Sequence, residues 1–260
     1  MSDLKTDDPG RNELIDRALE REWFYSYDLP GGQRTPTYHH GELDAIHDTR
    51  WEMLNTHLKS VFAGQYAHLK AVDLASHQGF FALKTAQMGF AEVLGIEARQ
   101  SHVDDSTLIA DIYDLPQLNF MQSDIFDVDT RQLGQFDLVL MLGLLYHLEN
   151  PVGALRLCRE LCKGVCLIET QIVPGLTGVV DYGSYQFVRP LKGSFGIIDE
   201  TGETHGPEAS LTGICLIPSL EALKWLLLKV GFNEVSVLEP PETAYEQLRY
   251  GKRVMVAAHV

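Results

Sequence analysis

Three acidic residues in the first half of the chain each stand at the end of a short apolar segment. They are Asp73, Glu97 and Asp124. In a parallel α/β sheet such ends meet at one edge, where a carboxylate can accept hydrogen bonds from ribose hydroxyls or from the amino group of adenine. Each acid alone could equally cap a turn or end a solvated strand. Three in succession predict a nucleotide-type ligand, with its ribose on Glu97 and its adenine near Asp124 and Ile125.

The turn after the first of these acids indicates which nucleotide fits. Its sequence, VDLASHQG, contains one glycine, Gly79, and lacks the GxGxxG pattern that lets backbone approach a pyrophosphate. The chain also has no GK[ST] phosphate loop. A cofactor without phosphates tolerates larger side chains in this turn. The sequence therefore favours S-adenosylmethionine, with its methionine part beside Asp73, Ala75, Ser76 and Gly79.

These residues need a parallel sheet to position them, and the hydropathy pattern predicts one. The segment 136–143 is apolar on both faces, which is typical of a central parallel strand covered by helices, and Leu142 near its end joins the predicted cofactor site. The alternation of segments predicts a doubly wound α/β sheet with right-handed crossovers. The predicted strands are 69–74, 92–98, 119–125, 136–143, 164–173, 234–240 and 252–260, and the predicted helices are 79–89, 100–114, 151–163 and 219–232.

Two irregular segments interrupt this pattern. Residues 1–62 predict an N-terminal cap, with helices at 11–22 and 48–62 around an aromatic loop, on a catalytic domain of residues 63–260. Residues 174–212 form a predicted lid insertion, because loops of this length often cover binding sites. Aromatic side chains of both segments are predicted to line the cleft, with ordinary packing as the alternative: Tyr25, Tyr27, Tyr38, Tyr182, Tyr185 and Phe187.

Histidines supply candidates for acid–base and metal chemistry. His147 follows the central strand, and its side chain is suited to accepting a proton near neutral pH. The alternative is a hydrogen bond from His147 to backbone at the strand end. His39, His40 and His47 gather near acidic residues, but ten histidines in the chain make chance clustering the stronger interpretation, and we assign no metal to them.

Composition limits the function classes. With 21 Lys and Arg against 36 Asp and Glu, the formal net charge is −15, which disfavours a protein that binds by neutralising phosphates, although a local basic groove remains compatible. No apolar run is long enough to span a membrane, and the acidic N-terminus has no apolar signal core, so we expect a cytoplasmic chain. Cys158, Cys162 and Cys166 form no CxxC pair and are predicted to pack in the core.

The motifs VDLASHQGFFAL, VLGIEA, SDIF, FDLVLMLGLLYHLENP and CLIETQIV, in this order, resemble class I S-adenosylmethionine-dependent methyltransferases. The resemblance covers about residues 69–173, and residues 219–260 resemble the family's closing helix and reversed last strand. It implies a Rossmann-like, mostly parallel sheet of seven strands. The motif GLLYHLENP, with DTRWEML upstream, further resembles the wobble-uridine carboxymethyltransferase-like group. The turn departs from the family's D-x-G-x-G-x-G pattern at Ala75 and His77.

The narrower resemblance also implies a carboxylated cofactor, carboxy-S-adenosylmethionine, as an alternative. In that group a basic residue before a Trp, the Tyr of the LYH motif and a C-terminal Arg hold a carboxylate. Arg50, Tyr146 and Arg253 stand at the matching positions. Surface ion pairs and core packing are the competing interpretations, and the same residues could hold an acidic substrate.

The sequence as a whole predicts methyl transfer from S-adenosylmethionine to an oxygen or nitrogen of a small organic substrate. The residues assigned to catalysis are His147 and Tyr146, and those assigned to the substrate are Arg50, Tyr182, Tyr185 and Arg253. One alternative is a tRNA wobble-uridine modifier, against which the net charge of −15 counts. Another is a nucleotide-binding module without catalysis, which the divergent turn would suit. A homodimer is compatible with the sequence, and we expect neither a membrane nor a nucleic-acid partner.

Overall fold

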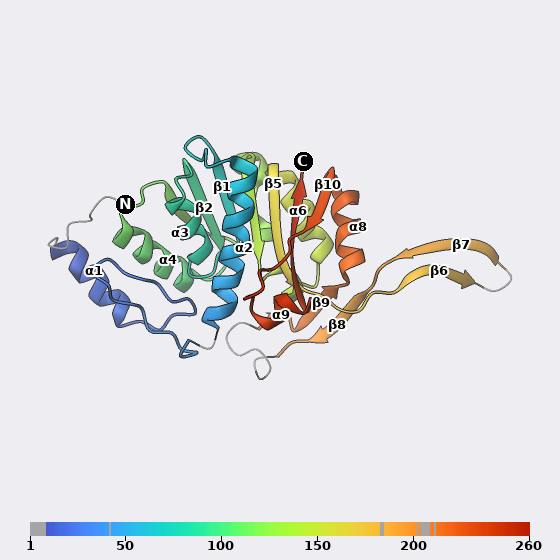
Figure 1. The fold of residues 1–260 in the computed structure, drawn as a ribbon, viewed down its shortest axis with the longest axis horizontal. Coiled ribbons are helices and arrows are strands. Elements are labelled where there is room, and N and C mark those ends of the chain that lie inside the picture. The colour runs from blue at the N-terminus through green and yellow to red at the C-terminus, as the bar shows by residue number, and fades with distance from the viewer. Residues whose placement is uncertain (1–8, 42, 183–184, 202, 204–208, 211) are drawn as a thin grey trace. The chain divides into compact units, whose positions relative to one another are not determined.

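The computed structural model describes residues 9–41, 43–182, 185–201, 203, 209–210 and 212–260, and its main feature is a seven-stranded sheet (Figure 1). The strands lie in the order β10 (Glu234–Val237), β11 (Arg253–His259), β5 (Cys162–Gln171), β4 (Phe136–Leu142), β1 (Lys70–Leu74), β2 (Glu92–Glu97) and β3 (Leu118–Gln122). This order confirms the predicted doubly wound, mostly parallel sheet. By its internal contacts the chain divides into two compact units, Met1–Val128 and Asp129–Val260.

In the first unit, three parallel strands bring the predicted acidic residues to one edge. β1 pairs with β2, and β2 pairs with β3, so that Asp73 lies opposite Gly95 and Glu97 opposite Gln122. The helices α3 (Phe80–Gln87) and α4 (Gln100–Tyr113) follow β1 and β2 and pack on these strands. The N-terminal helices are α1 (Pro9–Leu19) and α2 (Asp44–Phe62), both beginning before the predicted positions.

The second unit contains the reversed end of the sheet. β4 and β5 are parallel, whereas β11 runs antiparallel to β5 and β10 antiparallel to β11, which confirms the reversed last strand. Local signals set its helices: the Asn150 side chain caps α6 (Pro151–Leu161), and Ser219 caps α8 (Leu220–Val230), which ends at Gly231 with a φ of 113°. The short elements are η1 (Ile125–Asp127), α5 (Thr130–Leu133), η2 (Leu145–His147) and α9 (Glu246–Arg249).

The insertion after β5 is more regular than its glycine content suggests. β6 (Thr177–Tyr182) and β7 (Tyr185–Lys192) form an antiparallel hairpin, visible in Figure 1 as two long strands side by side. β8 (Phe195–Asp199) pairs antiparallel with β9 (Ile214–Pro218). Valine, isoleucine and aromatic residues, which favour strands, are frequent in these segments and outweigh the glycines. Among the described residues, no helix is long and apolar enough to cross a membrane.

Candidate active site

Asp73 lies buried at the end of β1, where its carboxyl group is poorly satisfied by the protein. Burial raises the pKa of this carboxyl to about 8. Within the described part of the chain, neither Asp73 Oδ2 nor the buried Ser76 Oγ has a hydrogen-bond partner. Leaving such atoms unpaired costs free energy, so the pair suits a ligand that donates hydrogen bonds. The methionine ammonium group of S-adenosylmethionine is such a donor, and these residues therefore fit that cofactor.

The turn between β1 and α3 has an unusual backbone. Ala75, His77 and Gly79 have φ values of 55°, 52° and 84°. Residues other than glycine rarely adopt this left-handed conformation, and strained positions of this kind gather at ligand sites. The turn is held by hydrogen bonds from Ser76 N to Ile96 O and from Gly79 N to Ser76 O, both 2.9 Å. The structure thus contains a turn at this place with left-handed residues at Ala75 and His77, and its binding of a cofactor stays a prediction.

Glu97, at the end of β2, is a buried carboxylate that the protein keeps ionised. Its two oxygens accept hydrogen bonds from His77 N and Arg99 N, each at 2.9 Å. Burial by itself would raise the pKa of Glu97, but the nearby His102 ring, with Nδ1 3.7 Å from Oε1, and the hydrogen bond from the Arg99 amide hold it below its usual value. Each carboxylate oxygen has a second lone pair, so Glu97 can still accept hydrogen bonds from ribose hydroxyls.

The third predicted acid has a local structural role. Asp124 is exposed, and its Oδ1 accepts a hydrogen bond of 2.8 Å from Phe126 N, which caps η1. The neighbouring Ile125 is buried. The capping role that the sequence left open for Asp124 is therefore real, and its second oxygen is the one that a ligand could use. An adenine position at Asp124 and Ile125 stays a prediction.

The N-terminal aromatic segment braces the cofactor turn. Tyr27 OH donates to Gln78 O at 2.6 Å, and Gln78 Oε1 accepts from Phe24 N at 2.7 Å. Tyr25 stacks on Phe80 with ring centroids 5.0 Å apart. Tyr25 and Tyr27 are both buried, which agrees with ordinary packing, the alternative to lining a cleft. Tyr38 is partly exposed. The segment thus fixes the turn from the outside.

Among the described residues, the histidines of this segment are not part of a group of side chains placed to hold a metal ion. His39 uses both ring nitrogens: Nε2 lies 2.6 Å from Phe24 O, and Nδ1 accepts from Leu43 N at 3.3 Å. A ring engaged in this way cannot ligate an ion without losing a hydrogen bond. His40 is in a turn with a φ of 52°, and His47 is buried in α2.

In the second unit, Tyr146 and Arg253 meet as the resemblance implies, but with a third residue. Arg253 donates to Tyr146 OH at 2.9 Å, while its Nε donates to Glu169 Oε1 at 2.6 Å. All three side chains are buried. Burial alone would lower the pKa of Arg253, but the Glu169 carboxylate raises it, so the guanidinium stays charged. Because Glu169 already balances this charge, Arg253 is poorly suited to holding a carboxylate of a ligand.

The other predicted residues are placed as follows. Leu142 is the last residue of β4, and Arg50 is a buried residue of α2 in the first unit. Tyr182 and Tyr185 are register partners where β6 meets β7, and their side chains, with that of Phe187, lie outside what the structure describes. Cys158, Cys162 and Cys166 are buried free thiols, as predicted.

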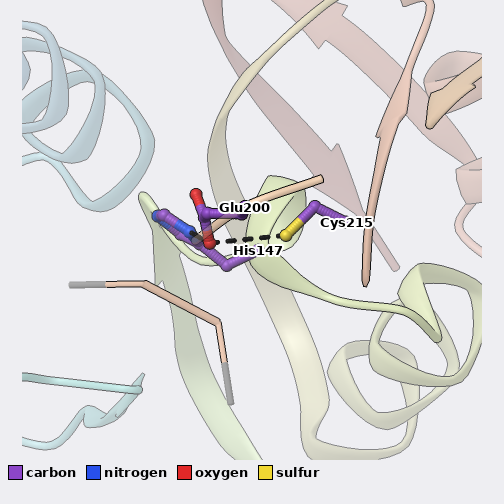
Figure 2. Close-up of side chains that lie close together, drawn as sticks. All are labelled: His147, Glu200 and Cys215. Atoms are coloured by element: carbon purple, nitrogen blue, oxygen red, sulfur yellow. Dashed lines mark hydrogen bonds and ion pairs between the residues drawn. The ribbon is translucent and has the colours of Figure 1, made fainter. Parts of the chain in front are cut away.

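His147, on η2, belongs to a cluster that includes two further reactive side chains (Figure 2). Its Nδ1 lies 2.7 Å from Glu200 Oε2, which also accepts hydrogen bonds from Ser210 N at 2.7 Å and from Cys215 Sγ at 3.3 Å. Glu200 and Cys215 are buried, whereas the His147 side chain is 16% exposed. Burial alone would raise the pKa of Glu200, but the hydrogen bond from His147 lowers it.

This arrangement defines the state of the histidine ring. Because an ionised carboxylate only accepts hydrogen bonds, Nδ1 carries a proton, and in the neutral ring Nε2 then carries the lone pair. Burial and the Glu200 carboxylate raise the pKa of the Cys215 thiol to about 11, so the sulfur keeps its proton. The cluster can therefore accept a proton at Nε2.

Sequence reasoning missed Glu169, Glu200 and Cys215. Glu200 lies 53 residues from His147 along the chain, within an insertion without a recognisable motif. Only the pairing of β8 with β9 brings Glu200 and Cys215 to η2. For Glu169 the sequence did contain a signal. This residue lies in the predicted strand 164–173, and a charged side chain in a strand that is buried on both faces needs a partner of opposite charge.

Comparisons with known proteins agree with this fold. Residues 66–176 match a family described as a methyltransferase domain. A tRNA U34 carboxymethyltransferase of Trichodesmium erythraeum (strain IMS101) is 28% identical over 204 residues, covering 78% of this chain and 54% of that protein. A ubiquinone biosynthesis O-methyltransferase of Acinetobacter baylyi (strain ATCC 33305 / BD413 / ADP1) is 26% identical over 121 residues, covering 46% of this chain and 48% of that protein.

A solved structure matches nearly the whole chain. The N-terminal domain of EvdMO1 with SAH bound superposes with a TM-score of 0.70 at 21% identity, covering 96% of this chain and 97% of that one. The chain therefore shares the fold of this SAH-bound domain. The chain spans about half the length of the curated relatives it matches.

Proposed function

We propose that this chain, which carries a class I methyltransferase domain, transfers a methyl group from S-adenosylmethionine to a hydroxyl oxygen of a small organic acceptor. The observation that carries the proposal is the pair of buried carboxylates, Asp73 and Glu97, at the ends of two adjacent parallel strands. Buried carboxyl groups are uncommon in a protein core, and Asp73 has one oxygen without a hydrogen-bond partner among the described residues. They have a clear use at this edge of a nucleotide-binding sheet.

The cofactor is assigned to residues of the first unit. At the methionine end, Asp73 Oδ2 accepts a hydrogen bond and the Ser76 hydroxyl accepts or donates one. Both atoms are buried and lack a partner among the described residues. Glu97 accepts from the ribose hydroxyls through the remaining lone pairs of an ionised carboxylate. When bound, the cofactor supplies an activated methyl group on a sulfonium.

The acceptor chemistry is assigned to the second unit. Glu200 holds the His147 ring by the 2.7 Å hydrogen bond at Nδ1, so Nε2 takes the proton that the acceptor hydroxyl loses. Glu200 acts through His147 and is a positioning residue. A nitrogen acceptor has less need of such a base, which is why the cluster favours oxygen. The O-methyltransferase among the relatives supports the same choice.

A carboxymethyl transfer to tRNA is the second candidate, because several relatives bear that name. Two observations count against it. The charge of Arg253, which would hold the extra carboxylate, is already balanced by Glu169 at 2.6 Å. The net charge of −15 also disfavours a polyanionic substrate. Substrate roles for Arg50, Tyr182 and Tyr185, a cytoplasmic location and a homodimer remain predictions from the sequence.

The ligand retained by the purified chain distinguishes these candidates. Native mass spectrometry, followed by denaturation and accurate mass measurement of what is released, separates S-adenosylmethionine from its carboxylated form. We expect S-adenosylmethionine or its demethylated product. Carboxy-S-adenosylmethionine as the retained species would overturn the proposal in favour of carboxymethyl transfer.

A further inference from the structure

We propose that His147, Glu200 and Cys215 bind a zinc ion, and that this ion switches off proton acceptance by His147. The binding itself rests only on the geometry of the three side chains. The inhibitory effect rests in addition on the proposed function, in which His147 accepts a proton from the substrate. The two parts are therefore tested separately.

The three side chains offer one ligand atom each from three separate elements. One ring nitrogen of His147, one carboxylate oxygen of Glu200 and the Cys215 Sγ all lie within 4.8 Å of one another (Figure 2). They come from η2, from the residue that follows β8, and from β9. Imidazole nitrogen, carboxylate oxygen and thiolate sulfur are the three ligand types that zinc takes in proteins.

Two of the three distances between ligand atoms need only a small adjustment, and the third, between His147 and Cys215, lies within 4.8 Å. Zinc bonds of about 2.0–2.3 Å in a tetrahedral arrangement place neighbouring ligand atoms about 3.3–3.8 Å apart. The distance of 3.3 Å between Cys215 Sγ and Glu200 Oε2 is already in that range. The distance of 2.7 Å between His147 Nδ1 and Glu200 Oε2 is a hydrogen bond that the ion would replace, so the two side chains must separate by about 0.6 Å.

The charges balance when the ion binds. The two positive charges of zinc meet one negative charge from Glu200 and one from the Cys215 thiolate, while the His147 ring is neutral. The thiol proton leaves to solvent, and the ring proton moves from Nδ1 to Nε2. A neutral complex is favourable because Glu200 and Cys215 are buried. The hydrogen bond from Ser210 N to Glu200 supports the ligand from behind.

Zinc on Nδ1 is incompatible with proton acceptance by the same ring. In the ion-free protein, Nδ1–H donates to Glu200, and Nε2 of the neutral ring carries the lone pair that the proposed function uses. When zinc takes the Nδ1 lone pair, the single proton of the neutral ring sits on Nε2, which can then only donate. Three protein ligands also leave one coordination position for water, which suits a reversibly bound ion.

Metal titration of the full chain tests the binding. The protein is treated with a chelator, dialysed, and titrated with zinc alone by calorimetry, and with cobalt as a spectroscopic probe of thiolate coordination. We expect one ion per chain and a thiolate-to-cobalt absorption band. Cys215→Ser removes the band and weakens binding at least about tenfold. Cys158→Ser, a buried cysteine of α6 outside the cluster, keeps both.

Failure of the chain to bind zinc, or a cobalt band that survives Cys215→Ser, would overturn the proposed site. Thermal unfolding of each variant confirms that it is folded. If Cys215→Ser is not folded, Glu200→Gln, which loses a ligand charge but keeps the thiolate, replaces it, and an unchanged zinc affinity in that variant would overturn the site. These titrations contain neither cofactor nor acceptor, so their outcome is independent of the proposed function.

Methyl transfer with and without zinc tests the switch. We expect stoichiometric zinc to lower the turnover of the wild-type chain at least about tenfold and a chelator to restore it. In Cys215→Ser the ratio of turnover with zinc to turnover without zinc should be close to one. A wild-type chain that binds one zinc ion and keeps its full turnover would overturn the inhibitory part of the proposal and leave the site standing.

Discussion

At the scale of single residues, the proposed chemistry rests on buried carboxyl groups whose pKa values are shifted in opposite directions. Burial raises the pKa of Asp73 to about 8, whereas hydrogen bonds lower the pKa of Glu97 and of Glu200 despite burial. The difference follows from what each oxygen accepts. One Asp73 oxygen has no partner among the described residues, while Glu97 and Glu200 each accept two or more hydrogen bonds.

The first prediction concerns the proposed base. His147→Ala should lower kcat by on the order of 10²–10⁴-fold and leave the affinity for S-adenosylmethionine unchanged, because the ring accepts the acceptor's proton and does not hold the cofactor. Glu200→Gln should lower kcat less and leave KM unchanged, with partial recovery in Glu200→Asp. Steady-state kinetics measure both effects. Full activity of His147→Ala would remove this residue from the mechanism.

The second prediction concerns the pH dependence of cofactor binding. With a pKa of about 8, Asp73 is protonated at neutral pH in the free protein, and a bound ammonium group favours its ionised form. Binding must therefore release a proton below pH 8, so affinity rises by up to about tenfold per pH unit and levels off above pH 8.

Calorimetric titrations in two buffers of different ionisation enthalpy measure this proton release. The cofactor's own amino group also titrates near this range, so the comparison is with Asp73→Asn, which should bind more weakly and release fewer protons. Equal proton release by the wild type and Asp73→Asn would contradict the assignment of Asp73.

The positions of Asp73 and Glu97 at the ends of adjacent strands could be predicted from the sequence, because each acid ends an apolar segment and the parallel topology brings such ends together. Glu169, Glu200 and Cys215 could not be assigned, because their partners are far along the chain. The contacts of Arg253 could be predicted only in part. Its hydrogen bond to Tyr146 agrees with the resemblance, whereas its ion pair with Glu169 could not be predicted from the sequence.

At the scale of elements, the turn from β1 to α3 connects fold and function. It combines three left-handed residues with close packing against Phe120 of β3, since a Cβ at Gly79 would lie 2.7 Å from the Phe120 ring. The apolar runs and their caps allowed the strands and helices of the sheet to be predicted. The antiparallel strand pairs of the insertion were not predicted, because each strand is stabilised mainly by its pairing with another strand and because glycines obscure the alternation of apolar and polar residues.

The third prediction uses this turn. Gly79→Ala should destabilise the fold by about 1–3 kcal/mol more than Gly89→Ala, because both positions have a positive φ but only Gly79 has a neighbour within contact of the added methyl group. Chemical denaturation measures both variants. Equal losses would show that backbone conformation alone, and not the approach of Phe120, requires glycine at position 79.

At the scale of the whole molecule, charge and length bear on the substrate. The net charge of −15 was the main sequence argument for a small acceptor, and the Arg253–Glu169 ion pair now adds a local one. The relatives named as tRNA enzymes are about twice as long as the stretch they share with this chain. Their activity therefore does not transfer to this chain by similarity alone.

The fourth prediction follows from the charge. Any binding of tRNA by this chain should be weak and nearly independent of salt, because few phosphates are neutralised. A titration of labelled tRNA at several salt concentrations gives the slope of log K against log salt. A steep negative slope would favour the tRNA candidate.

The central claim, that the edge formed by β1 and β2 holds S-adenosylmethionine, is tested most directly by calorimetric titration of this cofactor into the wild type and two variants. Glu97→Ala removes the proposed ribose acceptor, and Glu92→Ala changes a partly exposed acid at the other end of β2. We predict that Glu97→Ala weakens binding by about 10–100-fold, as expected for losing hydrogen bonds to a charged group, and that Glu92→Ala binds like the wild type. Unchanged affinity in Glu97→Ala would contradict the account.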